Sequence, residues 1–259
     1  MTENITTANK TPYVSVVMPA HNESDGIEKS IRVIKKILVD MDTSYEIIVV
    51  DDGSVDGTFQ RVQQVAAENR ALKGIQLSRN FGKESAILAG LEAAGGDVVI
   101  TIDADLQHPP ELIPIMLGLW RDGYKVVHAV KKDRSTDTRI ARWRAVIFNG
   151  LMSRLGGVDV RNSSDFKLLD RMAVNAIVNA LPERRRFYRG LADWIGFSQT
   201  SIPFAVAERD SGEGKWSFFA LADLAMTAIV SFTSAPLRIA TFLGLLTLVF
   251  GLIIATDAL

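Results

Sequence analysis

Short apolar runs rich in β-branched residues alternate along the first hundred residues with stretches of helical character. This alternation constrains the fold more than any other feature of the sequence. The runs predict strands at Tyr13–Met18, Tyr45–Val50, Gly74–Leu77 and Val98–Ile102. Helices are predicted from Ser24 or Asp25 to about Val39, then to about Asn69 and to about Ala94. A βαβαβαβ order predicts an α/β fold with a mostly parallel sheet and helices on both faces.

The last of these runs ends in Asp103-Ala104-Asp105-Leu106-Gln107 and is stopped by Pro109-Pro110. Because side chains alternate along an extended chain, Asp103, Asp105 and Gln107 can point the same way. Oxygen ligands at the carboxyl end of a strand suit a hard divalent cation that holds a diphosphate. The alternative is a solvated turn, but a patterned trio after a buried strand favours a site.

The loop Asp51-Asp52-Gly53-Ser54 follows the second predicted strand and faces the same edge of the sheet. A carboxylate there can accept hydrogen bonds from a pyrimidine N–H or from ribose hydroxyls. The same four residues also form common turns, so this loop alone does not separate the two interpretations. The sequence has no Gly-x-Gly-x-x-Gly after the first strand and no P-loop motif, so a dinucleotide dehydrogenase or a P-loop enzyme is unsupported.

The net charge of -1 conceals a basic block. Residues 131–189 contain 14 basic and 6 acidic side chains, which calls for an anionic partner. A nucleic acid is disfavoured as that partner, because the arginines are not interleaved with a stacking platform of aromatic residues. The absence of cysteine excludes disulfides and thiol chemistry and fits a cytosolic face.

The end of the chain is apolar. Ile239–Ala255 contains no charged residue and follows Arg238, which predicts a transmembrane helix over 236–259 that continues in a longer protein. Residues 216–235 begin with aromatic side chains and predict an amphipathic helix in the membrane interface. Core helices are the alternative for both segments. Residues 1–12 are predicted to be a flexible tail.

Four ordered motifs carry a family resemblance: PAHNES from Pro19, VVDDGSVDGT from Val49, SRNFGKESAILAG from Ser78 and DADLQHPPE from Asp103. Together they resemble the inverting glycosyltransferases of family 2, which have the A-type, Rossmann-like fold. Within that family the chain is most similar to polyprenyl-phosphate glycosyltransferases, such as dolichyl-phosphate mannose synthases and bactoprenol glucosyltransferases. SSDFKLLDR from Ser163, ERRRFYRGLADWIGFSQ from Glu183 and ERDSGEGKW from Glu208 resemble their acceptor-side segments. The resemblance implies a glycosyltransferase domain over 13–215.

The resemblance also implies roles for individual residues. It places Pro19, His21, Glu23, Val50, Asp52, Asp103, Ala104 and Asp105 around the donor nucleotide sugar. It assigns Asp103, Asp105 and Gln107 to the metal, Mg²⁺ or Mn²⁺, and Asp103, Asp105 and Asp165 to catalysis. Candidate ligands of the acceptor phosphate are Arg134, Arg139, Arg142, Arg144, Arg209 and Lys215. Gly214 replaces a serine and His21 a tyrosine of many relatives, while Arg139 departs from the glutamine of the processive polysaccharide synthases.

The implied reaction is the transfer of a hexose with inversion to undecaprenyl phosphate, at the cytosolic face of the cytoplasmic membrane. Glucose from UDP-glucose is the preferred candidate for the transferred sugar. Because a phosphate monoester is already largely deprotonated at neutral pH, Asp165 is expected to position a substrate rather than to act as a base. Alternatives are a sugar or protein acceptor, a mannose synthase that uses GDP-mannose, and a degenerate nucleotide-sugar-binding module. The resemblance also suggests further membrane helices and a homo-oligomer.

Overall fold

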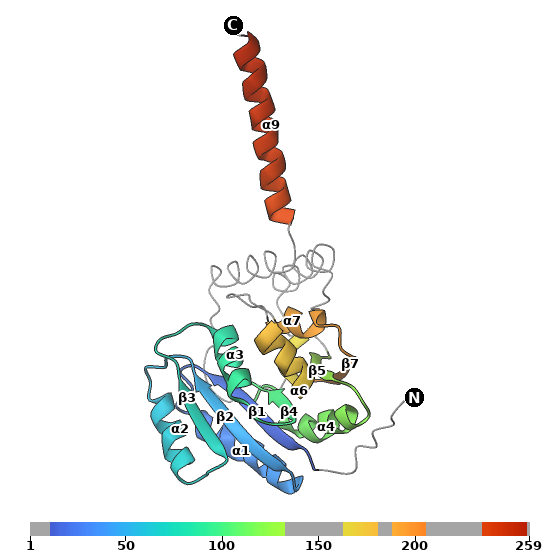
Figure 1. The fold of residues 1–259 in the computed structure, drawn as a ribbon. Helices are drawn as coiled ribbons and strands as arrows, with labels where there is room; N and C mark the ends of the chain where they lie inside the picture. The colour runs from blue at the N-terminus through green and yellow to red at the C-terminus, as the bar shows by residue number, and fades with distance from the viewer. Residues whose placement is uncertain (1–10, 133–162, 181–187, 206–234, 258–259) are drawn as a thin grey trace.

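The computed structural model describes residues 11–132, 163–180, 188–205 and 235–257. Within these ranges a single sheet of seven strands runs through the protein in the order β3-β2-β1-β4-β6-β5-β7. Helices cover both of its faces (Figure 1). This arrangement confirms the predicted α/β class with helices on both faces.

The four predicted strands are present as β1 (Tyr13–Ala20), β2 (Ser44–Asp51), β3 (Leu72–Gln76) and β4 (Val98–Thr101). They pair in parallel. The second half of the sheet is formed by β5 (Val126–Lys131), β6 (Ser163–Asp170) and β7 (Gln199–Phe204). β6 is antiparallel to both β4 and β5, whereas β5 and β7 are parallel. The sheet is therefore mostly parallel, with one reversed strand.

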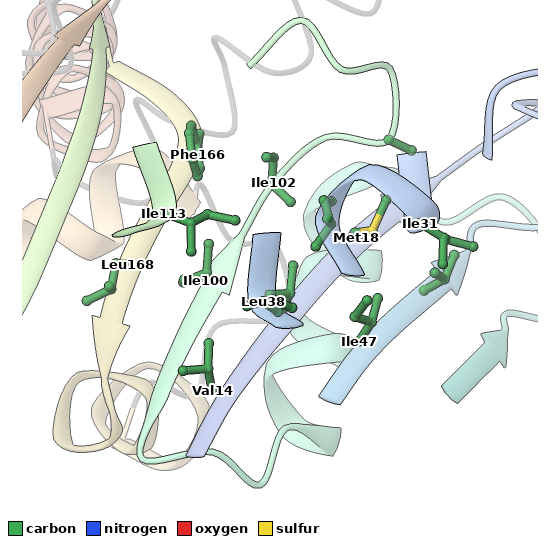
Figure 2. Packing of buried hydrophobic residues seen from close by; sticks show 14 of the residues in the cluster. Val14, Met18, Ile31, Leu38, Ile47, Ile100, Ile102, Ile113, Phe166 and Leu168 are labelled. Carbon is green, nitrogen blue, oxygen red and sulfur yellow. The ribbon is translucent and has the colours of Figure 1, made fainter. Parts of the chain in front are cut away.

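One apolar layer lies between the sheet and the helices α1 (Ile27–Asp40), α2 (Thr58–Ala67) and α4 (Ile113–Arg121), with the short turn η1 (Pro110–Leu112) leading into α4. Figure 2 shows side chains of α1, such as Ile31 and Leu38, near Ile47 of β2 and Met18 of β1. Both of these strands present alternate residues to this layer.

The opposite face carries a second apolar layer beneath α3 (Lys83–Ala93), α6 (Arg171–Asn175) with the π-helical turn η3 (Ala176–Ala180), and α7 (Tyr188–Trp194). α3 approaches the sheet closely at Gly90, where a Cβ atom would lie 2.2 Å from Cγ1 of Val17 and 3.2 Å from Cγ2 of Val50. Only glycine permits this contact. The start of α3 is thereby held near the carboxyl ends of β1 and β2.

Two local predictions at the first strand are wrong. α1 begins after Gly26 without a side-chain cap, because Ser24 and Asp25 lie inside a turn in which the backbone N–H groups of Gly26 and Ile27 donate to the carbonyl of Glu23. The strand β1 also continues through Pro19 to Ala20. Pro19 is tolerated because β4 pairs with β1 only as far as Val17, so the N–H that proline lacks falls beyond that ladder.

The C-terminal apolar segment forms α9 (Ala235–Asp257), which projects away from the sheet (Figure 1). Its described side chains are exposed, with Phe242 and Phe250 more than 60% exposed. None of the helices in the described ranges is long and apolar enough to cross a membrane, so the predicted span over 236–259 lacks support from the structure. The interfacial helix predicted over 216–235 lies almost wholly outside the described residues.

Candidate active site

The three polar loops singled out in the sequence meet at one edge of the sheet. They follow β1, β2 and β4, which are parallel neighbours, so their carboxyl ends face the same edge. The backbone N–H of Asp52 donates to the carbonyl of Ala20 at 2.8 Å and joins the first two loops. The backbone N–H of Ile102 donates to the carbonyl of Val17 at 3.0 Å and joins the third.

A lysine connects two of the predicted catalytic carboxylates. Nζ of Lys83 lies 2.6 Å from Oδ1 of Asp103 and 2.5 Å from Oδ2 of Asp165. Asp103 follows β4, Asp165 lies on β6, and Lys83 is the first residue of α3. The Asp165 side chain is only 5% exposed, so its charge is largely removed from water. The structure therefore brings the DADLQ motif and the SSDFKLLDR motif together through a residue of a third motif.

The segment between Asp105 and Gln107 has an unusual backbone. Leu106 has a φ of 54°, a left-handed conformation that is rare for a leucine. The backbone N–H of Gln107 donates to Oδ1 of Asp105 at 3.1 Å and closes the turn. On the helix side, the hydroxyl of Ser30 donates to the carbonyl of Ala104 at 2.5 Å. The Asp105 carboxylate is thus tethered within a strained turn, and Gln107 follows directly after it.

The described residues contain no group of three or more His, Cys, Asp or Glu side chains that could hold a metal ion. The turn offers a smaller set of oxygen donors: the carboxylate of Asp105 and the amide of Gln107, both partly exposed, beside Asp103. Mg²⁺ is commonly bound by one or two carboxylates together with the phosphates of a substrate. The donor atoms therefore fit a divalent cation whose coordination is completed by a diphosphate.

His108 lies just behind this turn and was not predicted as a site residue. It is 6% exposed, and its ring packs against Phe166 and Phe204 with centroid distances of 5.7 and 5.4 Å. Its Nδ1 lies 3.6 Å from Oδ2 of Asp103. Burial is the largest cause that lowers the pKa of His108 and outweighs the Asp103 carboxylate, which raises it. His108 is therefore a neutral ring that packs beside Asp103, and its Nδ1 makes no hydrogen bond within the described residues.

The carboxylate of Asp52 is engaged by protein rather than open at the loop surface. Its two oxygens accept hydrogen bonds from the backbone N–H groups of Phe81 at 2.8 Å and Gly82 at 2.9 Å. His21 lies beside it: Nδ1 donates to the carbonyl of Asp52 at 2.9 Å, and Nε2 accepts from Asn80 at 3.1 Å. Asp52 and His21 therefore tie the loops after β1 and β2 to the segment that precedes α3.

Two hydroxyl groups hold the backbone of the acceptor-side residue Asp165. The hydroxyl of Thr101 donates to the carbonyl of Asp165 at 2.5 Å and accepts from the hydroxyl of Tyr188, 2.9 Å away. Tyr188 is 3% exposed, and burial raises the pKa of its hydroxyl. The phenol therefore stays protonated and acts as a donor. This pair fixes the backbone on which Asp165 is carried.

The remaining predicted donor residues differ in what they present. Pro19, Val50 and Ala104 are buried at the ends of their strands or just beyond and contribute packing rather than polar side chains. Glu23 is partly exposed, and its backbone N–H donates to the Thr58 hydroxyl at 2.9 Å. All six predicted acceptor-phosphate ligands lie outside the described residues: Arg134, Arg139, Arg142, Arg144, Arg209 and Lys215.

Comparison with known proteins agrees with this geometry. The sheet and its edge of carboxylates define a nucleotide-sugar glycosyltransferase of the A type. The chain belongs to glycosyl transferase family 2, whose family model matches residues 15–180. It is 41% identical over 232 residues to an uncharacterized glycosyltransferase of Synechocystis, a match that covers 89% of this chain and 73% of that protein.

A second relative and one solved structure differ in how similar their sequences are to this chain. The bactoprenol glucosyl transferase of Shigella phage SfV is 36% identical over 233 residues, covering 90% of this chain and 76% of that protein. Among solved structures, glucosyl-3-phosphoglycerate synthase from Mycobacterium tuberculosis, in complex with Mn²⁺, UDP-glucose and phosphoglyceric acid, has a TM-score of 0.55 at 21% identity. That match covers 84% of this chain and 77% of the synthase. It shows the fold alone.

Proposed function

We propose that this protein transfers glucose from UDP-glucose to undecaprenyl phosphate with inversion at the anomeric carbon. The observation that carries the proposal is the meeting of Asp103 and Asp165 at Lys83, which joins the donor-side and acceptor-side motifs at one edge of the sheet. The substrate class is supported by the bactoprenol glucosyl transferases, which are about one-third identical over 90% of this chain.

The chemistry requires the anomeric carbon to lie between two anions. A phosphate oxygen of the lipid forms a bond to that carbon, while the bond to the UDP oxygen breaks and UDP leaves with the electron pair. The second pKa of a phosphate monoester is about 6, so the nucleophile is already largely ionised at neutral pH. Asp165, held by Lys83 and nearly buried, is placed to orient a substrate rather than to remove a proton.

A divalent cation, Mg²⁺ or Mn²⁺, would be held by Asp105 and Gln107 beside Asp103. When bound, it supplies positive charge to the departing diphosphate. The solved relatives with Mn²⁺ and a nucleotide sugar support this part of the proposal. The protein's own contribution is the strained turn at Leu106, which holds the Asp105 carboxylate in place before any ligand arrives.

We further propose that the reaction takes place at the cytosolic face of the cytoplasmic membrane. α9 exposes apolar side chains on the described part of its surface, among them Leu246 and Phe250. Contiguous exposed apolar surface of this size is a mark of contact with a membrane or a partner. A lipid-linked acceptor makes a membrane the fitting environment.

The test is transfer of radiolabelled sugar from a panel of UDP-sugars and GDP-mannose to undecaprenyl phosphate, with membranes that contain the protein and Mg²⁺ or Mn²⁺. We expect a labelled lipid from UDP-glucose. EDTA should abolish it, and Asp105→Ala should reduce it by about 100-fold or more, the loss typical of an essential electrostatic group. A protein that binds UDP-glucose but labels only a sugar or protein acceptor would overturn the lipid assignment.

A further inference from the structure

Five consecutive residues, Asn80 to Glu84, contact every loop and strand end that forms the candidate site. On the donor side, Asn80 donates to Nε2 of His21 at 3.1 Å, and the backbone N–H groups of the next two residues both donate to the carboxylate of Asp52. Gly53 packs directly on this segment, since a Cβ atom there would lie 2.5 Å from the backbone nitrogen of Asn80.

On the acceptor side, the same segment reaches β6 and α7. Lys83 pairs with Asp103 and Asp165, and Oε2 of Glu84 accepts from the backbone N–H of Tyr188 at 2.6 Å. The Tyr188 hydroxyl leads back to Asp165 through Thr101. We call Asn80–Glu84 the coupling segment.

Charge explains why a lysine is needed at this point. The two carboxylate oxygens that contact Nζ can lie no further apart than the two contact distances combined, so without the ammonium the charge of the partly exposed Asp103 would repel that of the nearly buried Asp165. Other charged or titratable groups near them are Asp105, Glu84 and the neutral His108 and Tyr188. Among the described residues, the positive charge that holds the pair together is that of Lys83.

A second lysine shows what an ordinary contact of this kind looks like. Lys73 of β3 lies 2.6 Å from Glu46, but its side chain is 55% exposed, against 29% for Lys83. Glu46 also accepts from the backbone N–H of Gly95, which precedes β4, so this contact lies at the amino edge of the sheet, away from the candidate site. Lys73 therefore provides a matched control for the loss of a lysine–carboxylate pair.

We propose that Lys83 is a positioning residue that holds the acceptor-side Asp165 in register with the donor-side Asp103, through a coupling segment that is itself anchored on the donor loops. The proposal rests on the proposed function, because it takes Asp165 to orient a substrate for transfer. Loss of the Lys83 side chain should slow the transfer step while the donor still binds. The turn from Asp105 to Gln107 is closed by its own hydrogen bond and does not depend on Lys83.

The experiment compares Lys83→Met, Lys83→Arg and Lys73→Met in vesicles that contain undecaprenyl phosphate. It measures kcat, KM for the lipid, and the Kd for UDP in the presence of Mn²⁺ by calorimetry. Lys83→Met should lower kcat by about 100-fold, the cost of a misplaced reacting group, while the Kd changes by less than about threefold. Lys83→Arg keeps the charge and should recover about tenfold of that loss. Lys73→Met should match the wild type in all three.

A double-mutant cycle separates positioning from a merely structural role. If Lys83 acts through Asp165, Lys83→Met adds little to the loss caused by Asp165→Asn, whereas independent losses would multiply. Multiplied losses, or equal kcat values for Lys83→Met and Lys73→Met, would overturn the proposal. If Lys83→Met does not fold, as judged by the absence of a cooperative thermal unfolding transition, the same cycle is run with Lys83→Arg.

The proposed function can fail separately. If the wild-type protein produced no labelled lipid, the lipid acceptor would be rejected. The role of Lys83 would then be tested on stability instead of on transfer. The cycle is then measured on thermal unfolding, where contacting charged residues give a non-additive change in the free energy of unfolding. Additive changes would reject the link between Lys83 and Asp165.

Discussion

Leu106 shows how a single residue can be used against its own preference. A non-glycine residue in the left-handed region costs about 1–2 kcal/mol, yet Leu106 adopts it between the two proposed metal-binding side chains. The cost is offset by the Asp105–Gln107 turn and by the Ser30 contact to Ala104. Strain of this kind persists where the surroundings fix the backbone, and it places side chains before a ligand binds.

This conformation predicts an inverted order of stability for two variants. Leu106→Gly and Leu106→Ala both remove the leucine side chain, so they differ only in backbone preference. At an ordinary position alanine would be the more stable by about 0.5–1 kcal/mol. At Leu106 we expect the glycine variant to be more stable by about 1 kcal/mol in urea unfolding. An alanine variant as stable as, or more stable than, the glycine variant would contradict the left-handed backbone.

Among the elements, β6 is fixed by a buried polar chain as well as by apolar packing. Lys167 is fully buried, and its ammonium donates to Nδ1 of His128 on β5 at 2.7 Å. Nε2 of His128 in turn donates to Gln199 of β7 at 2.9 Å and lies 3.1 Å from Asp193 of α7. The strands β5 and β7 and the helix α7 are thus joined to β6 at Lys167, two residues beyond Asp165. A buried polar network of this kind favours one arrangement of the elements it connects.

This network predicts an acid-sensitive stability. Burial, and next the Lys167 ammonium, lower the pKa of His128 from 6.5 to about 3. The unfolded chain therefore binds the proton first, and stability is lost as the pH falls from about 7 toward 3. Between pH 7 and pH 5 the contribution of His128 to this loss is about 2 kcal/mol.

The measurement is the free energy of unfolding of the wild type and of His128→Asn at pH 5, 6 and 7. Asparagine cannot titrate and keeps an acceptor for Lys167, so the variant should lose less stability than the wild type on acidification, whatever its stability at pH 7. Parallel pH dependences for the two proteins would place His128 outside the acid response.

Across the whole molecule, the sequence predicted the parts of the fold that follow from local composition. β1, β2 and β4 are apolar or β-branched runs, β3 has the mixed sequence LKGIQ, and each strand lies within a few residues of its predicted position. β6 was missed because Ser163, Asp165 and Lys167 interrupt any apolar run; Asp165 and Lys167 contact Lys83 and His128, which lie far away in the sequence. Its reversed direction likewise depends on tertiary contacts that no local pattern encodes.

The candidate site divides in the same way. Asp103, Asp105 and Gln107 could be found because they follow an apolar strand directly. Lys83 could not, because its partner Asp165 lies 82 positions away in the sequence. One local signal was available. The positive charge of a lysine in the first turn of a helix is unfavourable next to the positive end of the helix dipole, so a lysine at this position indicates a negatively charged partner.

The proposed place of the whole protein at the membrane depends on α9 and can be tested there. Phe242, Leu246 and Phe250 are exposed and four residues apart, so they lie along one side of the helix.

Arginine at all three positions should detach the protein from membranes, since each arginine costs about 2.5–3.5 kcal/mol inside a bilayer. The control Val39→Arg adds one such charge at a 54% exposed position near the end of α1, away from the candidate site. Sedimentation with vesicles should fall for the triple variant alone, and its transfer to vesicle-borne undecaprenyl phosphate should fall with it while UDP binding is kept. If the triple variant sedimented like the control, α9 would not be the attachment, and the membrane contact would have to come from another part of the chain.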